Sequence, residues 1–159
     1  MDDRHWDNDD QAHCFRAFLL ATHLLLDRLD RELQRNAEMP LAYFQILACL
    51  AQAPEHALRM SDLAANLHAS KSRLSHAATR LEERGWVQRL SCPEDKRGSL
   101  AVLTDHGARA LEAASPGLAQ CMREHLFDQL TAAQLKQLRS LSEHIAGHLC
   151  GAAEPGPAD

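Results

Sequence analysis

The segment spanning residues 60–104 constrains the fold most, because the spacing of its apolar residues changes partway along it. Apolar residues in 63–67 follow a helical period, and Ser61 stands where it can cap this short helix. A tight turn leads to a second helix, which Ser70 can cap and which Gly85 ends. This pattern predicts a helix-turn-helix.

After the second helix the apolar residues alternate with a period of about two, first in 86–90 and again in 100–103. Pro93 and Gly98 between these runs are typical of a loop. The predicted hairpin follows the helix-turn-helix directly. We therefore expect a mainly α chain with a small two- or three-stranded β-wing, a winged helix-turn-helix, and double-stranded DNA is the first partner to consider.

The net charge of this 159-residue chain, −5, conceals a basic segment. Residues 58–99 contain eight Lys and Arg against five Asp and Glu, a local charge of +3. A basic surface on an acidic body can bind phosphates, while the acidic remainder discourages indiscriminate sticking. A charge of +3 is also compatible with an ordinary solvated surface.

Helices with broad apolar faces are predicted on both sides of this unit. Residues 11–36 carry apolar side chains at three- and four-residue intervals, and a second helix follows Pro40. Beyond the hairpin we expect a helix that is kinked or broken at Pro116-Gly117. A last helix opens with the capping box Thr131–Gln134. The central unit is too small to cover all these apolar faces, so a second copy of the chain is expected to pair with them.

A symmetric dimer would place two recognition helices on the order of 34 Å apart on an inverted-repeat site. The predicted organisation has five parts: a disordered acidic leader (1–10), an N-terminal dimerisation helix (11–36), a winged helix-turn-helix DNA-binding domain (37–104), C-terminal dimerisation helices (105–150) and a disordered tail (151–159).

Several short motifs, in the same order and at similar separations, resemble the multiple antibiotic resistance regulator (MarR) family of winged-helix repressors. They are Asp95-Lys96-Arg97 in the wing, the strand end Leu103-Thr104, and the segments 59–64, 81–85 and 92–95. The resemblance covers roughly residues 12–150. It implies a homodimeric DNA-binding transcription factor, expected to be a repressor, whose signal changes the spacing between two DNA-binding lobes.

The resemblance, together with the chemistry of each position, selects ten residues for DNA binding. The start of the recognition helix offers hydroxyls, cations and backbone N–H groups to phosphates, in Ser70, Lys71, Ser72 and Arg73. Further along this helix, base edges come within reach of Ser75, His76 and Arg80. At the wing tip Lys96 and Arg97 would enter or flank the minor groove, with Asp95 holding Arg97 in position. The alternative for each is a solvated surface side chain.

The family commonly binds small phenolic or other aromatic molecules in a cleft between the terminal helices and the DNA-binding lobe. The candidate lining residues are His13, Arg16, His23, Tyr43 and Cys49. Arg16 could pair with a carboxylate, and Tyr43 offers both a ring and a hydroxyl. Ordinary packing and surface polarity explain the same residues.

Thiol oxidation and metal binding are alternative signals. Cys14-Phe15 resembles the Cys-Phe pair of the family's organic hydroperoxide repressors, although their nearby tyrosine is replaced here by Phe18. Cys14 is the first redox candidate and Cys92, beside the wing, the second; a small buried hydrophobe is the other interpretation of Cys14. His144 and His148 are four residues apart on one helix, which suits a shared metal ion, but the pair is weak support without a carboxylate. No metal site and no cofactor are predicted.

Other function classes find little support. The serines lack nucleophile-elbow glycines, and neither a phosphate-cradling glycine-rich loop nor an HExxH motif is present, so an enzyme is not expected. The five cysteines form no CxxC pair and no apolar stretch has the length of a membrane span, which predicts a cytoplasmic protein with reduced thiols. The remaining competitor is a winged helix that binds protein, for which cations on the wing would be unnecessary.

Overall fold

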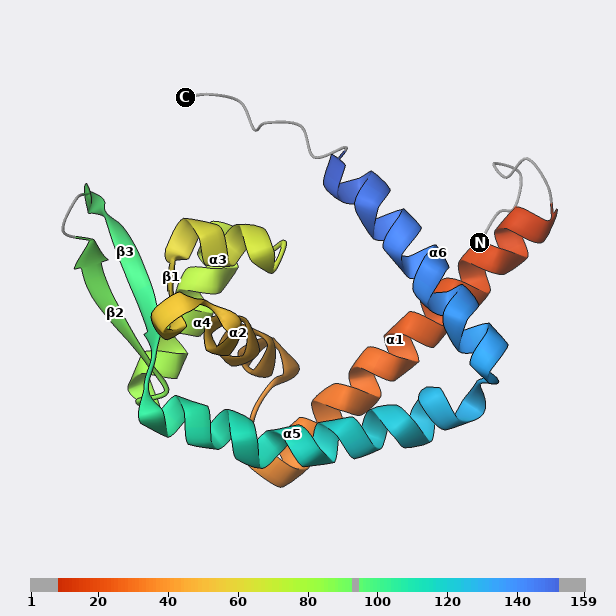
Figure 1. Cartoon of the computed structure of the whole chain (residues 1–159), viewed down its shortest axis with the longest axis horizontal. Helices are drawn as coiled ribbons and strands as arrows, with labels where there is room; N and C mark the ends of the chain where they lie inside the picture. The colour runs from red at the N-terminus through yellow and green to blue at the C-terminus, as the bar shows by residue number, and fades with distance from the viewer. Residues whose placement is uncertain (1–8, 93–94, 152–159) are drawn as a thin grey trace. The chain divides into compact units, whose positions relative to one another are not determined.

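The computed structural model describes residues 9–92 and 95–151, and among these it leaves the side chains of 92 and 95–97 undescribed. It divides into two compact units, one up to Cys121 and one from Met122 onward, and each is treated by itself. The elements in chain order are α1 (Asp9–Ala37), α2 (Leu41–Gln52), the 3-10 helix η2 (Pro54–His56), β1 (Ala57–Arg59), α3 (Met60–Asn66), α4 (Lys71–Glu83), β2 (Val87–Cys92), β3 (Asp95–Leu103), α5 (Asp105–His125), the 3-10 helix η3 (Phe127–Gln129) and α6 (Ala132–Gly151) (Figure 1).

The boundaries of the terminal helices differ slightly from the sequence-based prediction. Asp9 and Asp10, assigned to a disordered leader, form the first turn of α1, where their negative charge favours the helix dipole. Gly151, assigned to the tail, is the last residue of α6. The remaining leader and tail residues lie outside the described ranges, so the prediction of disorder there stays a prediction.

The turn between α1 and α2 forms at the predicted position before Pro40. Glu38 adopts a left-handed φ of 49°, and the Met39 amide donates to the Leu33 carbonyl over 3.3 Å, which closes the C-terminus of α1. Asp30 of α1 then accepts a 2.8 Å hydrogen bond from the Leu41 amide, one of the unpaired donors at the start of α2. This carboxylate ties the long helix to the next one.

Helices α3 and α4 form the predicted helix-turn-helix. Ser70 caps α4 as expected, because its Oγ accepts the Arg73 amide over 3.3 Å. The prediction that Ser61 caps α3 is wrong: Arg59 occupies that position, and the Ser61 hydroxyl, already inside the helix, donates to the Asp62 carboxylate over 3.1 Å. Gly85 ends the second helix with a φ of 67°, a conformation that glycine adopts without a steric penalty.

The wing is a three-stranded antiparallel sheet in the order β1-β3-β2. The predicted hairpin is the β2–β3 pair, in which Val87 lies opposite Leu103, with an irregularity after Ser91. The third strand, β1, adds Ala57 opposite Val102 at the other edge of β3. Because β1 leads directly into α3, the sheet fixes where the helix-turn-helix begins.

One hydrophobic core joins α2, α3, α4 and the base of the wing. Leu47, Leu50, Leu63 and Leu81 are completely buried in it, and Trp86 is nearly so. Removing one such leucine side chain costs about 2–5 kcal/mol. The core therefore fixes α4 against the sheet and leaves the opposite face of α4 exposed to solvent.

Helix α5 begins with a threonine cap against the base of the wing. The Thr104 hydroxyl donates to the Gly85 carbonyl over 2.7 Å and accepts the Gly107 amide over 3.0 Å. Of the predicted kink or break at Pro116-Gly117, the break is wrong, since α5 continues through Pro116 to His125, and the kink stays a prediction.

We expect Thr104→Ala to lower the free energy of unfolding by about 1–2 kcal/mol, because the helix cap is lost and the Gly85 carbonyl loses its partner. Chemical denaturation followed by circular dichroism at fixed protein concentration measures this difference. Thr104→Ser keeps the hydroxyl and should retain most of the stability. Equal losses in both variants would show that the methyl group, and not the hydroxyl, is responsible.

The second unit contains the end of α5, η3 and α6. The predicted capping box is confirmed: the Thr131 amide donates to Gln134 Oε1 over 2.9 Å, and the Gln134 amide donates to Thr131 Oγ1 over 3.3 Å. Among the described helices, none combines the length and the hydrophobicity that a bilayer-crossing segment requires.

Candidate nucleic-acid interface

Helix α4 buries one face and exposes the other. Leu74, Ala78 and Leu81 anchor it in the core. The exposed side carries most of the predicted DNA-binding residues of this helix, together with a threonine that the sequence analysis did not select: Lys71, Ser72, Arg73, Ser75, His76, Thr79 and Arg80. This surface combines hydroxyls, cations and an imidazole, which are donors suited to phosphates and base edges.

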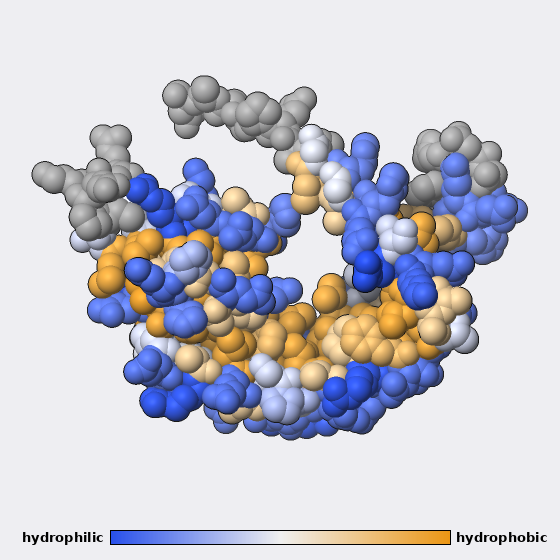
Figure 2. All heavy atoms as spheres, viewed as in Figure 1, coloured by the Kyte–Doolittle hydropathy of each residue, from blue (hydrophilic) through white to orange (hydrophobic). Residues whose placement is uncertain are grey.

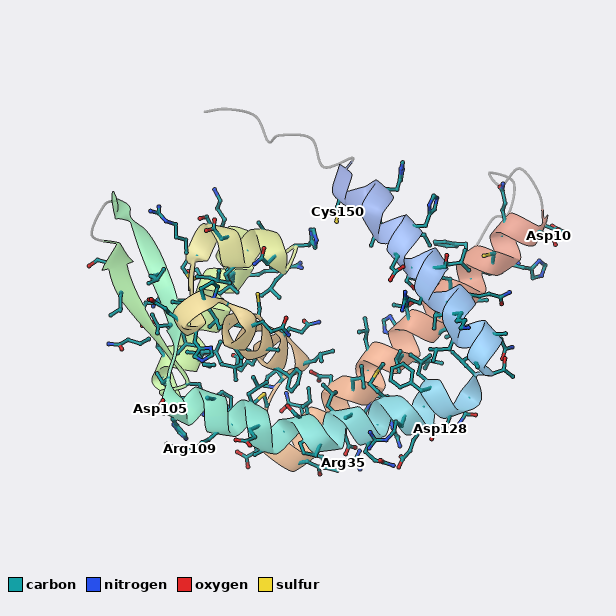
Figure 3. The ribbon with its side chains drawn as sticks, viewed as in Figure 1. Asp10, Arg35, Asp105, Arg109, Asp128 and Cys150 are labelled. Carbon is teal, nitrogen blue, oxygen red and sulfur yellow. The ribbon has the colours of Figure 1, made fainter. Side chains whose placement is uncertain are left out.

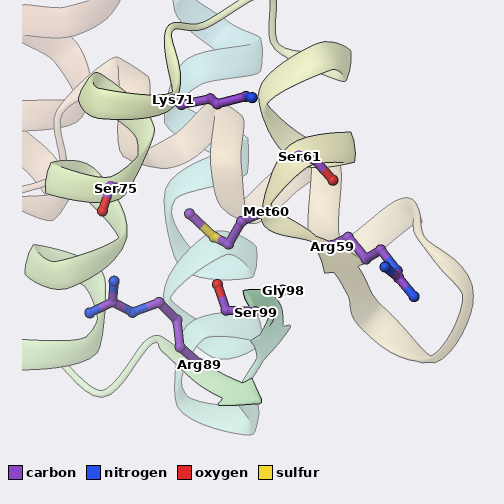
Figure 4. Close-up of a pocket in the computed structure, with 8 residues that line it drawn as sticks. All are labelled: Arg59, Met60, Ser61, Lys71, Ser75, Arg89, Gly98 and Ser99. Carbon is purple, nitrogen blue, oxygen red and sulfur yellow. The ribbon is translucent and has the colours of Figure 1, made fainter. Parts of the chain in front are cut away.

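A pocket of about 320 Å³ lies between this helix, the start of α3 and the wing. Its lining residues are Arg59, Met60, Ser61, Lys71, Ser75, Arg89, Gly98 and Ser99 (Figure 4). In Figure 4, Lys71 reaches across from α4 toward α3, and the Arg89 side chain extends from β2 toward α4. The three cationic side chains thus come from three elements, β1, α4 and β2.

Arg89 is held in place by α4. Its Nε donates to Glu82 Oε2, its backbone amide donates to Glu82 Oε1 over 2.9 Å, and its Nη2 donates to Thr79 Oγ1 over 3.2 Å. Both Arg89 and Glu82 are about 30 % exposed. Sequence reasoning missed this site, although strand periodicity contained a signal: Arg89 is two residues beyond the buried Val87 and so lies on the same face of β2.

Arg80 occupies the other flank of α4. It forms an exposed ion pair with Glu83, with 2.8 Å between Nη1 and Oε2, and this hydrogen bond raises the pKa of the guanidinium above its ordinary value. The exposed pair with Glu83 lowers the net positive charge on this flank of α4.

For the candidate DNA-binding residues at the wing tip, the structure describes the backbone but not the side chains. Asp95, Lys96 and Arg97 form the beginning of β3, and Asp95 pairs with Cys92 of β2. The predicted minor-groove contacts of Lys96 and Arg97, and the support of Arg97 by Asp95, stay predictions.

Comparisons with known proteins agree with the family suggested by the motifs. The model of the MarR family matches residues 40–99, which cover the helix-turn-helix and much of the wing. The multiple antibiotic resistance protein MarR of Escherichia coli strain K12 is 30% identical over 119 residues, which are 75% of this chain and 81% of that protein. The chain belongs to the MarR family.

Two solved structures of MarR family transcriptional regulators from Streptomyces coelicolor resemble the chain over nearly its whole length. Sco3205, solved in complex with DNA, is 42% identical with a TM-score of 0.89, and the match covers 97% of this chain and 96% of that one. AbsC is 35% identical with a TM-score of 0.85, covering 92% and 99%. The winged helix-turn-helix is therefore that of the MarR DNA-binding transcriptional regulators.

In this MarR-family chain, none of the pockets described contains more than one of the five predicted ligand-binding residues, so their shared site stays a prediction. His23 contributes to a pocket between α1 and α2, whereas Tyr43 lines one between α2 and α4. Cys49 receives a weak 3.9 Å contact from Asn66 of α3. His13 Nδ1 donates to the Asp9 carbonyl over 2.8 Å, and Arg16 lies one turn further along α1. A site containing all five would need a rearrangement or a second copy.

The described cysteines differ in solvent exposure. Cys14 is exposed on α1, and Cys150 is exposed near the end of α6 (Figure 3). The helical stripes predicted that Cys49, Cys121 and Cys150 belong to the core: Cys121 is buried and Cys49 half-buried, but the prediction is wrong for the exposed Cys150. The structure does not describe the side chain of Cys92. His144 and His148 are exposed on α6, and the described residues contain no group of three potential metal ligands.

Proposed function

We propose that this MarR-family regulator is a homodimeric repressor that binds an inverted repeat in double-stranded DNA. The observation that carries this proposal is the exposed face of α4, whose hydroxyls and cations adjoin the cationic pocket of Arg59, Lys71 and Arg89. The DNA complex of Sco3205, which is similar over almost the full chain, supports the same use of this fold.

The terminal helices support the dimer. Helix α1 exposes large apolar side chains to solvent, including Phe18, which is 59% exposed, and Leu24, which is 58% exposed. Exposing such side chains to water is unfavourable. Helix α6 does the same, with Leu141 at 62% and Leu149 at 63%. Figure 2 shows hydrophobic residues gathered along the part of the molecule that α1 occupies. Burying each such side chain contributes about 1.5–3 kcal/mol, and a second copy provides the matching apolar surface.

Lys71→Ala combined with Arg73→Ala should weaken DNA binding at least tenfold at about 0.1 M salt, because phosphate contacts dominate affinity. The slope of log affinity against log salt should fall by about one for each lost contact. Fluorescence anisotropy with a labelled fragment from the region upstream of the protein's own gene measures both.

The matched control removes two cations from α1. Arg31→Ala with Arg35→Ala changes the net charge equally, and both arginines are well exposed in weak pairs with Asp27 and Glu32. This control should bind nearly as the wild type does. If both double variants lose affinity equally, overall charge and not the face of α4 governs binding; if the wild type ignores every upstream fragment, the proposed function is wrong.

A small aromatic or phenolic molecule is the proposed signal for release from DNA. The pocket beside Tyr43 has a volume of about 480 Å³ and is also lined by residues of the recognition helix that include His76, Arg80 and Glu83, the ion-pair partner of Arg80. A carboxylated ring bound there would contact the residues expected to meet DNA. Thermal shift against phenolic and carboxylated compounds, followed by DNA competition, tests this: a compound that stabilises the protein and weakens DNA binding supports it, and a panel without one contradicts it.

Oxidation of Cys14 is the second proposed signal, supported by the exposure of this thiol on α1. Peroxide should release the wild type from DNA and leave Cys14→Ser bound. Cys150→Ser is the matched control, because that thiol is also exposed and should not matter. Release that persists unchanged in Cys14→Ser eliminates Cys14 as the sensor.

A further inference from the structure

Glu82 is an acidic residue on the recognition helix, where negative charge opposes DNA binding. Like charges repel across the interface, so a carboxylate beside the phosphate-binding surface lowers affinity unless it serves another purpose. The neighbouring Glu83 also places a negative charge on this helix. The two glutamates differ in the arginine that each one binds.

Both carboxylate oxygens of Glu82 are occupied by one residue of the wing. Oε2 accepts from Arg89 Nε, and Oε1 accepts from the Arg89 backbone amide. Thr79, one turn earlier on α4, accepts from Nη2 of the same guanidinium. Three nitrogens of the arginine are thus held by α4: the backbone amide, Nε and Nη2.

Arg89 is one of the residues that line the cationic pocket. A guanidinium carries more N–H donors than these bonds use. The pocket is also lined by Lys71 and by the hydroxyl-bearing residues Ser61, Ser75 and Ser99, and its described lining contains no acidic residue (Figure 4). Such a set of donors suits the oxygens of a backbone phosphate.

We propose that Glu82 is a positioning residue for DNA binding, which locks Arg89 so that its remaining N–H groups meet a backbone phosphate between the recognition helix and the wing. This inference rests on the proposed function and assigns one contact within it. A long arginine side chain loses conformational entropy when it binds, and pre-ordering by Glu82 and Thr79 removes part of that loss before DNA arrives.

Glu83 provides the matched control within the same helix. It pairs with Arg80 through one oxygen, and both side chains are more than half exposed. Glu82→Gln and Glu83→Gln each remove one negative charge. If charge alone mattered, both would tighten DNA binding, since each makes the surface more cationic.

The proposal predicts opposite signs for these two variants. Glu82→Gln should weaken binding of the full-length protein to its upstream fragment about fivefold and reduce the salt slope by about one per chain, because the phosphate contact of Arg89 is lost. Glu83→Gln should leave binding unchanged or tighten it. In an Arg89→Ala background, Glu82→Gln should no longer weaken binding, because there is no guanidinium left to position.

Three results would overturn the proposal. They are tighter binding by Glu82→Gln, a loss of equal size with and without Arg89, and wild-type affinity in Arg89→Lys, which keeps the charge but lacks the planar fork. The last variant decides the matter if Glu82→Gln does not fold. Failure of the wild type to bind DNA would instead refute the proposed function, so the two failures are distinguishable.

Discussion

Gly107→Ala is expected to lower the free energy of unfolding by about 3 kcal/mol, the largest effect of a single methyl group that we predict for this chain. A Cβ at this position would lie 2.1 Å from the Trp86 carbonyl oxygen and 2.9 Å from both the Trp86 carbonyl carbon and Leu103 Cδ1. The obstacle is backbone, next to the left-handed Gly85 and a buried indole, so it cannot move aside by a change of rotamer.

The matched control is Gly147→Ala in the middle of α6. Nothing lies within 4 Å of the Cβ position there, and alanine favours a helix over glycine by about 1 kcal/mol. This variant should be as stable as the wild type or more so. Urea unfolding monitored by circular dichroism, at one protein concentration for all variants, measures both. If Gly107→Ala were as stable as the wild type, the close contact between Gly107 of α5 and the Trp86 backbone at the base of the wing would be contradicted.

Leu20→Glu combined with Leu24→Glu should convert the proposed dimer to a monomer and weaken DNA binding about a hundredfold or more. Both leucines are strongly exposed on α1, at 60% and 58%, and a dimer would have to bury the new carboxylates among apolar side chains. A monomer engages only one half-site, so it loses the gain of about 10²–10⁴ that linked binding provides. Sedimentation velocity gives the mass, and anisotropy on the upstream fragment gives the affinity.

The control for this pair changes the net charge by the same amount at polar positions. Gln34→Glu with Arg35→Gln also makes α1 more negative by two, at exposed residues near its C-terminus. It should remain dimeric and lose little affinity. A monomeric wild type, or a leucine variant that stays dimeric, would contradict the proposed role of α1.

Local sequence signals predicted the elements wherever neighbouring residues supply the interactions. Ser70 caps α4 through an amide three residues away, and Gly85 ends it because glycine accepts a positive φ. The capping box at Thr131 formed for the same reason. Each of these features needs only a few adjacent residues, so the sequence contains all the information.

The failures occurred where packing outweighs local preference. Pro116 removes a helical hydrogen bond, but Ala114 and Leu118 on either side of it pack on the hydrophobic core, which keeps α5 continuous. Ser61 has the chemistry of a cap, yet the pairing of β1 with β3 places the start of α3 two residues too early for that role. Neither effect is visible from a window of adjacent residues.

In the candidate site, too, the sequence predicted the features that depend on neighbouring residues and missed those that depend on packing. The sequence alone predicted the winged helix-turn-helix, the recognition helix and most of the exposed hydrogen-bond donors of that helix. It could do so because the helical and strand periods of the apolar residues indicate which face of each element is apolar. Only the tertiary structure brought Arg89 of β2 onto Glu82 and Thr79 of α4 and grouped it with Arg59 and Lys71 in one pocket. Those contacts depend on how the wing packs against the helix, and that is decided by the shared core rather than by the spacing of residues along the chain.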